Sequence, residues 1–196
     1  MGNKWLSVKP SPNPKQRLVC IPYAGQSAAV FDDWSAALPD CVEVCAVELP
    51  GRRRRYKEPH VADVTTAARE VELALRGLPP LPTAVFGHSM GALIAFELSL
   101  GWNRRTGPLE LLVVSGCRAP HLKRREQPIH TLPREDFLAA LAALGGTHPE
   151  LLENEQLMRV VWSSGVRGHR DLELGLGDHR DRIDRDSPPD QRLRPR

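Results

Sequence analysis

The chain has 196 residues, of which 41% are hydrophobic and only 5% aromatic, and its formal net charge is +3. This length predicts one domain with a core of mainly leucine, valine and alanine. The charge is too small, and too closely mixed with acidic residues, to indicate a nucleic-acid-binding protein.

Residues 1–16 are polar and rich in proline, and we expect a flexible N-terminal segment there. They lack the apolar stretch of a signal peptide, and no later stretch is long enough to span a membrane. The expected location is therefore the cytoplasm.

The cysteines form no Cys-x-x-Cys pair, and no histidine cluster accompanies them. We therefore expect buried free thiols in a reducing compartment, and neither a metal site nor disulfides. The four positions are Cys20, Cys41, Cys45 and Cys117.

Apolar runs alternate with amphipathic segments from residue 17 onward. Strands are predicted at 17–21, 42–47, 83–87 and 111–115, and helices at 27–38, 61–78 and about 90–102. The strands are almost continuously apolar, which is typical of strands buried on both faces. The order of the elements predicts an α/β fold, with a parallel sheet and helices on both of its faces.

The pattern changes after residue 118. Two helices are expected here, one starting near residue 131 and one at about 149–162. Residues 118–162, which contain both helices, are expected to form a lid. Residues 163–196 contain eight arginines and six aspartates but no lysine, alanine or aromatic residue. This composition predicts a disordered tail.

The stretch Gly87-His88-Ser89-Met90-Gly91 lies between a predicted strand and a predicted helix. A Gly-x-Ser-x-Gly motif in this setting predicts a nucleophile elbow, a tight turn that exposes Ser89 at the edge of the sheet. The amide of Met90 would then point at the oxygen of the substrate. The alternative is a turn whose serine merely caps the following helix.

Residues 22–25, Pro-Tyr-Ala-Gly, directly follow the first predicted strand. In an α/β-hydrolase this loop supplies the second amide of the oxyanion hole. We assign that amide to Ala24, with Tyr23 and Gly25 as neighbouring alternatives. A glycine-containing turn without catalytic function would look the same.

Four consecutive arginines, Arg52, Arg53, Arg54 and Arg55, follow the second predicted strand, at the sheet edge that carries Ser89. Such a run can bind an acidic partner or a phosphate. The alternative interpretation is a solvated loop that binds no partner.

Taken together, the motifs at 22–25, 49–52, 87–91 and 115–120 resemble those of type II thioesterases, the editing enzymes of polyketide and nonribosomal peptide synthesis. Medium-chain acyl-carrier-protein hydrolases of animals share the pattern. The resemblance covers residues 17–162 and implies an α/β-hydrolase fold with a helical lid.

The resemblance further implies hydrolysis of acyl thioesters on the phosphopantetheine arm of acyl or peptidyl carrier proteins, which removes aberrant acyl groups. Ser89 would be the nucleophile, and the amides of Met90 and Ala24 would bind the oxyanion. No cofactor and no metal are implied, because the substrate itself carries the phosphopantetheine. We expect a monomer that contacts neither nucleic acid nor membrane.

The aspartate and the histidine that complete the family's triad are not visible in this sequence. The tail offers Asp171, Asp178, His169 and His179, but no predicted strand places any of them at the sheet edge. We expect an incomplete sheet, and the hypothesis for the tail is that it is a frameshifted or mispredicted end of the gene. The other histidines, at positions 60, 121, 130 and 148, are predicted at the surface.

Three functions remain open on this sequence. The first is a thioesterase, inactive if the base is absent. The second is a binding protein that recognises carrier proteins without catalysis. The third is a different α/β-hydrolase, an esterase, which would share the elbow but would not explain the Leu-Pro-Gly-Arg loop.

Overall fold

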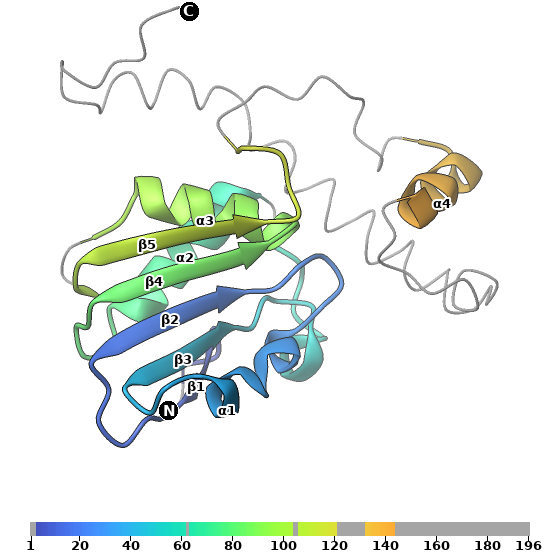
Figure 1. Cartoon of the computed structure of the whole chain (residues 1–196). Coiled ribbons are helices and arrows are strands. Elements are labelled where there is room, and N and C mark those ends of the chain that lie inside the picture. The colour runs from blue at the N-terminus through green and yellow to red at the C-terminus, as the bar shows by residue number, and fades with distance from the viewer. Residues whose placement is uncertain (1–2, 62, 104–105, 121–131, 144–196) are drawn as a thin grey trace, which may run out of the picture.

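One sheet organises the part of the chain that the computed structural model describes, which comprises residues 3–61, 63–103, 106–120 and 132–143. The strand order is β1-β3-β2-β4-β5, and helices lie on both faces (Figure 1). The strands are β1 (Leu6–Lys9), β2 (Gln16–Ile21), β3 (Val42–Val47), β4 (Thr83–His88) and β5 (Leu109–Ser115). The helices are η1 (Ala28–Phe31), α1 (Trp34–Ala37), η2 (Arg53–Arg55), α2 (Val64–Leu75), α3 (Met90–Leu100) and α4 (Arg134–Ala143).

The predicted parallel arrangement is confirmed for the four strands β2 to β5. Their register places Cys45, Val19, Val85 and Leu112 in one row across the sheet. Parallel strands end at the same edge, so the loops after β2, β3 and β4 meet there. Every motif singled out above, apart from the lid and the tail, lies on one of these loops or directly after β5.

Residues 1–16 were expected to be a flexible segment, but Leu6–Lys9 within them form the strand β1. It pairs antiparallel with β3 and places Leu6 opposite Val47. The side chain of Leu6 is buried in the core, and Val8 packs against the same core. The alternation of apolar and polar residues over four positions is too short to stand out within a proline-rich stretch.

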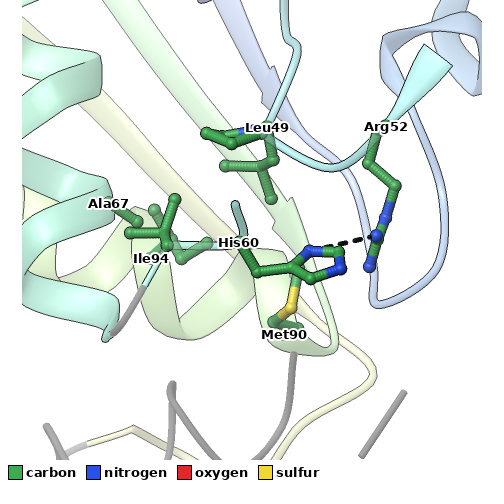
Figure 2. A pocket seen from close by; sticks show the side chains of 8 residues that line it. Leu49, Arg52, His60, Ala67, Met90 and Ile94 are labelled. Atoms are coloured by element: carbon green, nitrogen blue, oxygen red, sulfur yellow. Dashed lines mark hydrogen bonds between the residues drawn. The ribbon is translucent and has the colours of Figure 1, made fainter. Parts of the chain in front are cut away.

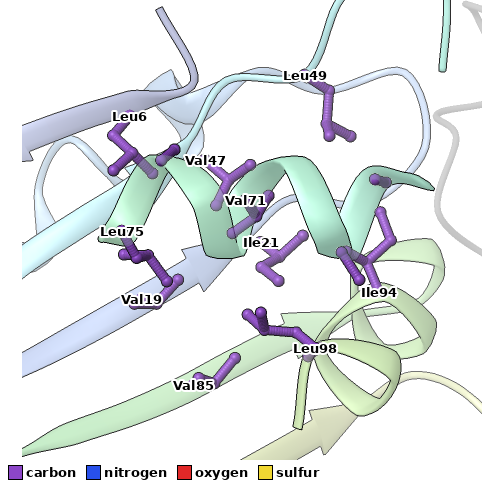
Figure 3. Packing of buried hydrophobic residues seen from close by; sticks show 14 of the residues in the cluster. Leu6, Val19, Ile21, Val47, Leu49, Val71, Leu75, Val85, Ile94 and Leu98 are labelled. Carbon is purple, nitrogen blue, oxygen red and sulfur yellow. The ribbon is translucent and has the colours of Figure 1, made fainter. Parts of the chain in front are cut away.

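Two apolar clusters cover the two faces of the sheet. The larger lies between the sheet and the helices α2 and α3, where Val71, Leu75, Ile94 and Leu98 pack against the strands (Figure 3). The smaller lies on the opposite face, where Phe31 of η1 is buried and Trp34 of α1 packs against it. The prediction of a sheet covered on both faces is therefore confirmed.

Two predicted helices have different bounds in the structure. The helix expected at 27–38 is divided into η1 and α1, because Asp32 and Asp33 occupy cap positions between them. The helix expected at 61–78 begins only at Val64, because the side chain of Asp63 caps it by accepting from the amide of Thr66 at 2.7 Å. Short polar side chains prefer such caps to helix interiors.

The strand β5 exposes apolar side chains, namely Leu111, Val113 and Val114. It pairs with β4 on one side and is the last strand of the sheet in the described residues. Within the same residues, no helix is long and apolar enough to cross a membrane.

The predicted free thiols are confirmed, since all four cysteines are unpaired. Cys20 and Cys45 are buried as expected, whereas Cys41 is half-buried and Cys117 is exposed. Cys117 follows β5 in a turn that leaves the sheet, so the core does not cover it.

Candidate active site

Ser89 joins the end of β4 to the start of α3 with a strained backbone. Its φ of 52° and ψ of −115° lie in a region that side-chain-bearing residues rarely adopt. Its amide donates to the carbonyl of Ser115 at 2.7 Å, which ties the turn to the end of β5. Strain of this kind persists only where the surrounding structure enforces it, and it concentrates at functional sites.

The side chain of Ser89 does not cap the helix that it precedes. A serine whose only task was to end the turn would accept a hydrogen bond from an amide of the first helical turn. The alternative interpretation of the motif is therefore wrong, and the hydroxyl is available for other chemistry.

The two glycines of the motif are needed because backbone lies directly against them. A Cβ on Gly87 would lie 2.1 Å from the carbonyl oxygen of Gly91. A Cβ on Gly91 would lie 2.2 Å from the carbonyl oxygen of Ile21. Backbone atoms cannot yield as the end of a flexible side chain can. A side chain on Gly87 would therefore push the start of α3 away from β4, and one on Gly91 would push it away from β2.

The predicted oxyanion residues lie on either side of this close approach. Met90 is the first residue of α3, where amides have no partner within the helix. Ala24 lies in the loop after β2, three residues beyond Ile21, and packs partly against the main core. The structure thus brings both loops to one edge of the sheet, while the aim of the two amides at a common oxygen stays a prediction.

His88 is held by neighbours of its own. Its Nδ1 lies 3.1 Å from the hydroxyl of Ser115, and the ring of Tyr23 meets its ring edge-on at 5.5 Å. A Cβ on Gly116 would lie 2.4 Å from the ring. The Nδ1 of His88 is thus directed to Ser115 at the end of β5 and not to Ser89.

A small pocket opens beside the elbow (Figure 2). Arg52 and His60 stand on its wall, and the guanidinium of Arg52 lies 3.3 Å from Nδ1 of His60. Six apolar or aliphatic residues complete the lining, namely Leu49, Pro50, Val61, Ala67, Met90 and Ile94. Met90, the residue after Ser89, lines the pocket, whereas Ser89 itself does not.

Sequence reasoning missed the place of His60, which was expected at the surface. The ring is half-buried and packs under the loop after β3, where a Cβ on Gly51 would lie 2.3 Å from it. The sequence gives only an indirect signal for this position. Gly51 in the Leu-Pro-Gly-Arg loop leaves space beside the backbone, and the ring of His60 occupies that space.

The four arginines do not share one environment. Arg53 and Arg54 are exposed, and Arg52 is half-buried in the pocket wall. Arg55 is 6% exposed. Partner binding by Arg55 was predicted, and that prediction is wrong because the side chain lies inside the protein.

Arg55 has structural partners for each part of its guanidinium. It donates to the backbone carbonyl of Glu48 at 2.8 Å and pairs with the carboxylate of Glu58 at 2.8 Å. It also lies 4.3 Å above the ring of Trp5. These contacts fix η2 against the sheet and leave Arg53 and Arg54 facing outward.

Most of the predicted lid and the whole tail lie outside the described residues. This holds for Asp171, Asp178, His169 and His179, and for the predicted helix at 149–162. The first of the two helices predicted for the lid is present as α4, while its role as a lid stays a prediction. Within the described residues, the hydroxyl of Ser89 makes no hydrogen bond to a histidine. The same residues contain no group of acidic, histidine or cysteine side chains that could hold a metal ion.

Comparison with known proteins gives a consistent result. The family model described as a thioesterase domain matches residues 16–186. The gramicidin S biosynthesis protein GrsT of Aneurinibacillus migulanus is 37% identical over 162 residues, which is 81% of this chain and 63% of that protein. Thioesterase PikA5 of Streptomyces venezuelae is 40% identical over 154 residues, which is 78% of this chain and 54% of that protein.

Among solved structures, the thioesterase RedJ of the prodiginine pathway of Streptomyces coelicolor superposes with a TM-score of 0.72 at 34% identity. The match covers 85% of this chain and 68% of RedJ. The chain spans less than two thirds of the length of GrsT and of PikA5.

Proposed function

This chain belongs to the thioesterase family, and we propose that it hydrolyses acyl thioesters held on the phosphopantetheine arm of acyl or peptidyl carrier proteins. The role we infer is removal of aberrant acyl groups during polyketide or nonribosomal peptide synthesis. The names of GrsT, PikA5 and RedJ, which refer to such pathways or to thioesterase activity, support this role.

The observation that carries the proposal is the strained backbone of Ser89 at the end of β4, without a capping bond from its side chain. In the proposed reaction, the oxygen of Ser89 attacks the thioester carbonyl and its proton passes to a base. The amides of Met90 and Ala24 donate to the oxyanion that forms. The carbon–sulfur bond then breaks, and the protonated thiol of phosphopantetheine leaves. Water attacks the acyl-serine and releases the carboxylic acid.

The partner would be the carrier domain that delivers the acyl group. Such domains are commonly acidic, and Arg53 and Arg54 present positive charge beside the site. We assign carrier contact to these two residues and exclude Arg55, which is buried. A monomer in the cytoplasm suffices for this function, and no cofactor takes part besides the substrate's own phosphopantetheine.

A second function is binding of the carrier protein without turnover. The observation in its favour is that, within the described residues, Ser89 has no histidine as a hydrogen-bond partner. A serine hydroxyl is a weak nucleophile unless a neighbouring base activates it.

Turnover of an acyl-pantetheine thioester, compared between the wild type and Ser89→Ala, tests the proposal. Turnover that disappears in Ser89→Ala supports the thioesterase. Folded protein that neither turns over the thioester nor reacts with a fluorophosphonate at Ser89, yet retains acyl-carrier protein on a column, supports the binding protein. Faster cleavage of the matching oxygen ester would favour an esterase instead.

A further inference from the structure

Three of the motifs singled out in the sequence meet in one cluster of side chains. Tyr23 lies in the loop after β2, His88 ends β4 and Ser115 ends β5. These three strands lie side by side in the sheet and end at the same edge (Figure 1). His88 contacts both of the other residues. The proposed reaction assigns no role to any of the three, so their contacts need an explanation of their own.

Ser115 holds the elbow through two contacts. Its carbonyl accepts from the amide of Ser89 at 2.7 Å, and its hydroxyl lies 3.1 Å from Nδ1 of His88. The next residue, Gly116, lies against the same ring, because a Cβ there would be 2.4 Å from Cε1 of His88. The end of β5 therefore fixes both the backbone of the proposed nucleophile and the orientation of the ring beside it.

The ring of His88 also reaches the loop after β2. Its centroid lies 5.5 Å from that of Tyr23, and the two planes meet at 81°, which is an edge-to-face geometry that aromatic pairs prefer. Tyr23 begins a tight turn, since its carbonyl accepts from the amide of Gln26 at 3.1 Å. Ala24 lies within this turn. The residue before Ser89 thus contacts the residue before the predicted oxyanion amide.

This ring contact gives the loop a second point of support. The first is at its beginning, where Gly91 lies against the carbonyls of Ile21 and Pro22. One point of contact leaves a segment free to rotate about it, whereas two points fix its direction. Tyr23 is 38% exposed, so burial in the core does not hold its side chain. The ring of His88 therefore supplies support that the core does not.

We propose that His88 is a positioning residue for the proposed reaction. Ser115 orients its ring. The ring, through Tyr23, holds the amide of Ala24 at a fixed distance from Ser89. An oxyanion donor stabilises the transition state only at the right distance, so a small displacement of the loop slows the reaction while substrate binding changes little. This inference rests on the proposed function, because it names a residue that supports the same site.

Four variants separate the parts of this cluster. His88→Asn keeps a polar group beside Ser115 but removes the ring, whereas His88→Phe keeps a ring that cannot bond to Ser115. Tyr23→Leu removes the other ring, and Tyr23→Phe keeps it. Tyr56→Leu is the matched control, because Tyr56 is the other tyrosine of the chain and is 67% exposed.

Hydrogen exchange of single amides, followed by NMR in the full chain, measures the loop without requiring turnover. The amide of Gln26 reports on the turn, because it donates to Tyr23. The amide of Arg17, which donates to a backbone carbonyl at 2.9 Å, reports on the opposite end of β2. In His88→Asn and in Tyr23→Leu, the amide of Gln26 should exchange roughly threefold to tenfold faster than in the wild type, and that of Arg17 should not change.

Turnover of the acyl-pantetheine thioester measures the catalytic consequence. His88→Asn should lower kcat by about tenfold to a hundredfold and change KM by less than about twofold. Tyr23→Leu should do the same, and the double variant should be no slower than either single one, because each removes the same contact. Tyr23→Phe and Tyr56→Leu should match the wild type in both measurements, and His88→Phe should lie between the wild type and His88→Asn.

Unchanged exchange of Gln26 in His88→Asn and Tyr23→Leu would overturn the inference and leave the proposed function standing. Equal acceleration at Gln26 and Arg17 would also overturn it, because the ring would then support the whole fold and not this loop. A normal kcat in variants whose loop exchanges faster would overturn it as well. If the wild type does not turn over the thioester, while exchange of Gln26 depends on both rings as expected, the proposed function fails and the support of the loop by His88 stands.

Discussion

Gly91 lies so close to Ile21 that a Cβ on the glycine would be 2.2 Å from the carbonyl oxygen of the isoleucine. The start of the helix α3 therefore rests directly on the end of β2. This contact brings the loop that carries Ala24 next to the elbow that carries Ser89. The loop after β2 and the elbow after β4 can therefore lie side by side because Gly91 has no side chain.

The substitution Gly91→Ala should destabilise the fold and disrupt the site. The added methyl group must displace backbone, which costs about 1–3 kcal/mol of unfolding free energy. Urea unfolding measures this loss. Gly101→Ala is the matched control, because a Cβ there has its nearest neighbour at 4.0 Å. Equal stability of the two variants would mean that the contact between α3 and β2 is looser than the structure indicates.

Ser89→Gly should be more stable than Ser89→Ala. Glycine adopts a positive φ without the steric cost that alanine retains, although it gains more entropy on unfolding. Since strain at such a residue is about 1–3 kcal/mol, we expect a net difference of about 1 kcal/mol. Thermal unfolding of both variants, neither of which can be acylated, measures it. If the alanine variant is the more stable, the backbone of residue 89 is unstrained.

The local part of the site follows from the sequence, and the non-local part does not. The elbow around Ser89 is defined by five adjacent residues between a strand and a helix, so its geometry is visible in the motif. His60 enters the pocket only because its segment folds back under Gly51. Arg55 stacks on Trp5, a residue fifty positions away, and no local pattern predicts that contact.

The same distinction applies to the fold. Mainly apolar runs identify β2, β3 and β4, as is typical of strands covered on both faces. The run of β5 is equally apolar, although Leu111, Val113 and Val114 are exposed there. The short strand β1 depends on its register with β3, which places Leu6 opposite Val47. No pattern of four residues specifies a partner forty positions away.

Arg55→Met should destabilise the protein, whereas Arg54→Met should not. Methionine keeps much of the volume of Arg55 but leaves the buried carbonyl of Glu48 without its charged donor. Loss of such a hydrogen bond costs about 1.5–3 kcal/mol, and exposed substitutions stay within about 0.5 kcal/mol. Urea unfolding distinguishes the two. Similar midpoints would mean that Arg55 is dispensable for the position of η2.

Reversal of charge at the exposed arginines should weaken carrier binding without loss of stability. Arg53→Glu combined with Arg54→Glu removes two positive charges beside the site and adds two negative ones. Surface plasmon resonance with an acyl-carrier protein should show an increase in Kd of about tenfold or more at low salt, with a smaller effect at high salt. The control Lys15→Glu combined with Arg69→Glu makes the same change in net charge at exposed residues outside this loop. An equal effect of both pairs would indicate that only net charge matters.

The buried thiols should make stability fall at alkaline pH. Burial raises the pKa of Cys20 and of Cys45 from 9.0 to about 12. The unfolded chain therefore releases these protons above about pH 9, while the folded chain still holds them, so the free energy of unfolding decreases as pH rises from 9 toward 12. Below pH 9 their contribution is complete. Urea unfolding between pH 7 and pH 11 should give a shallower decline in Cys20→Ala combined with Cys45→Ala than in the wild type. Parallel declines in the two proteins would assign the loss to other groups and contradict this account of the two thiols.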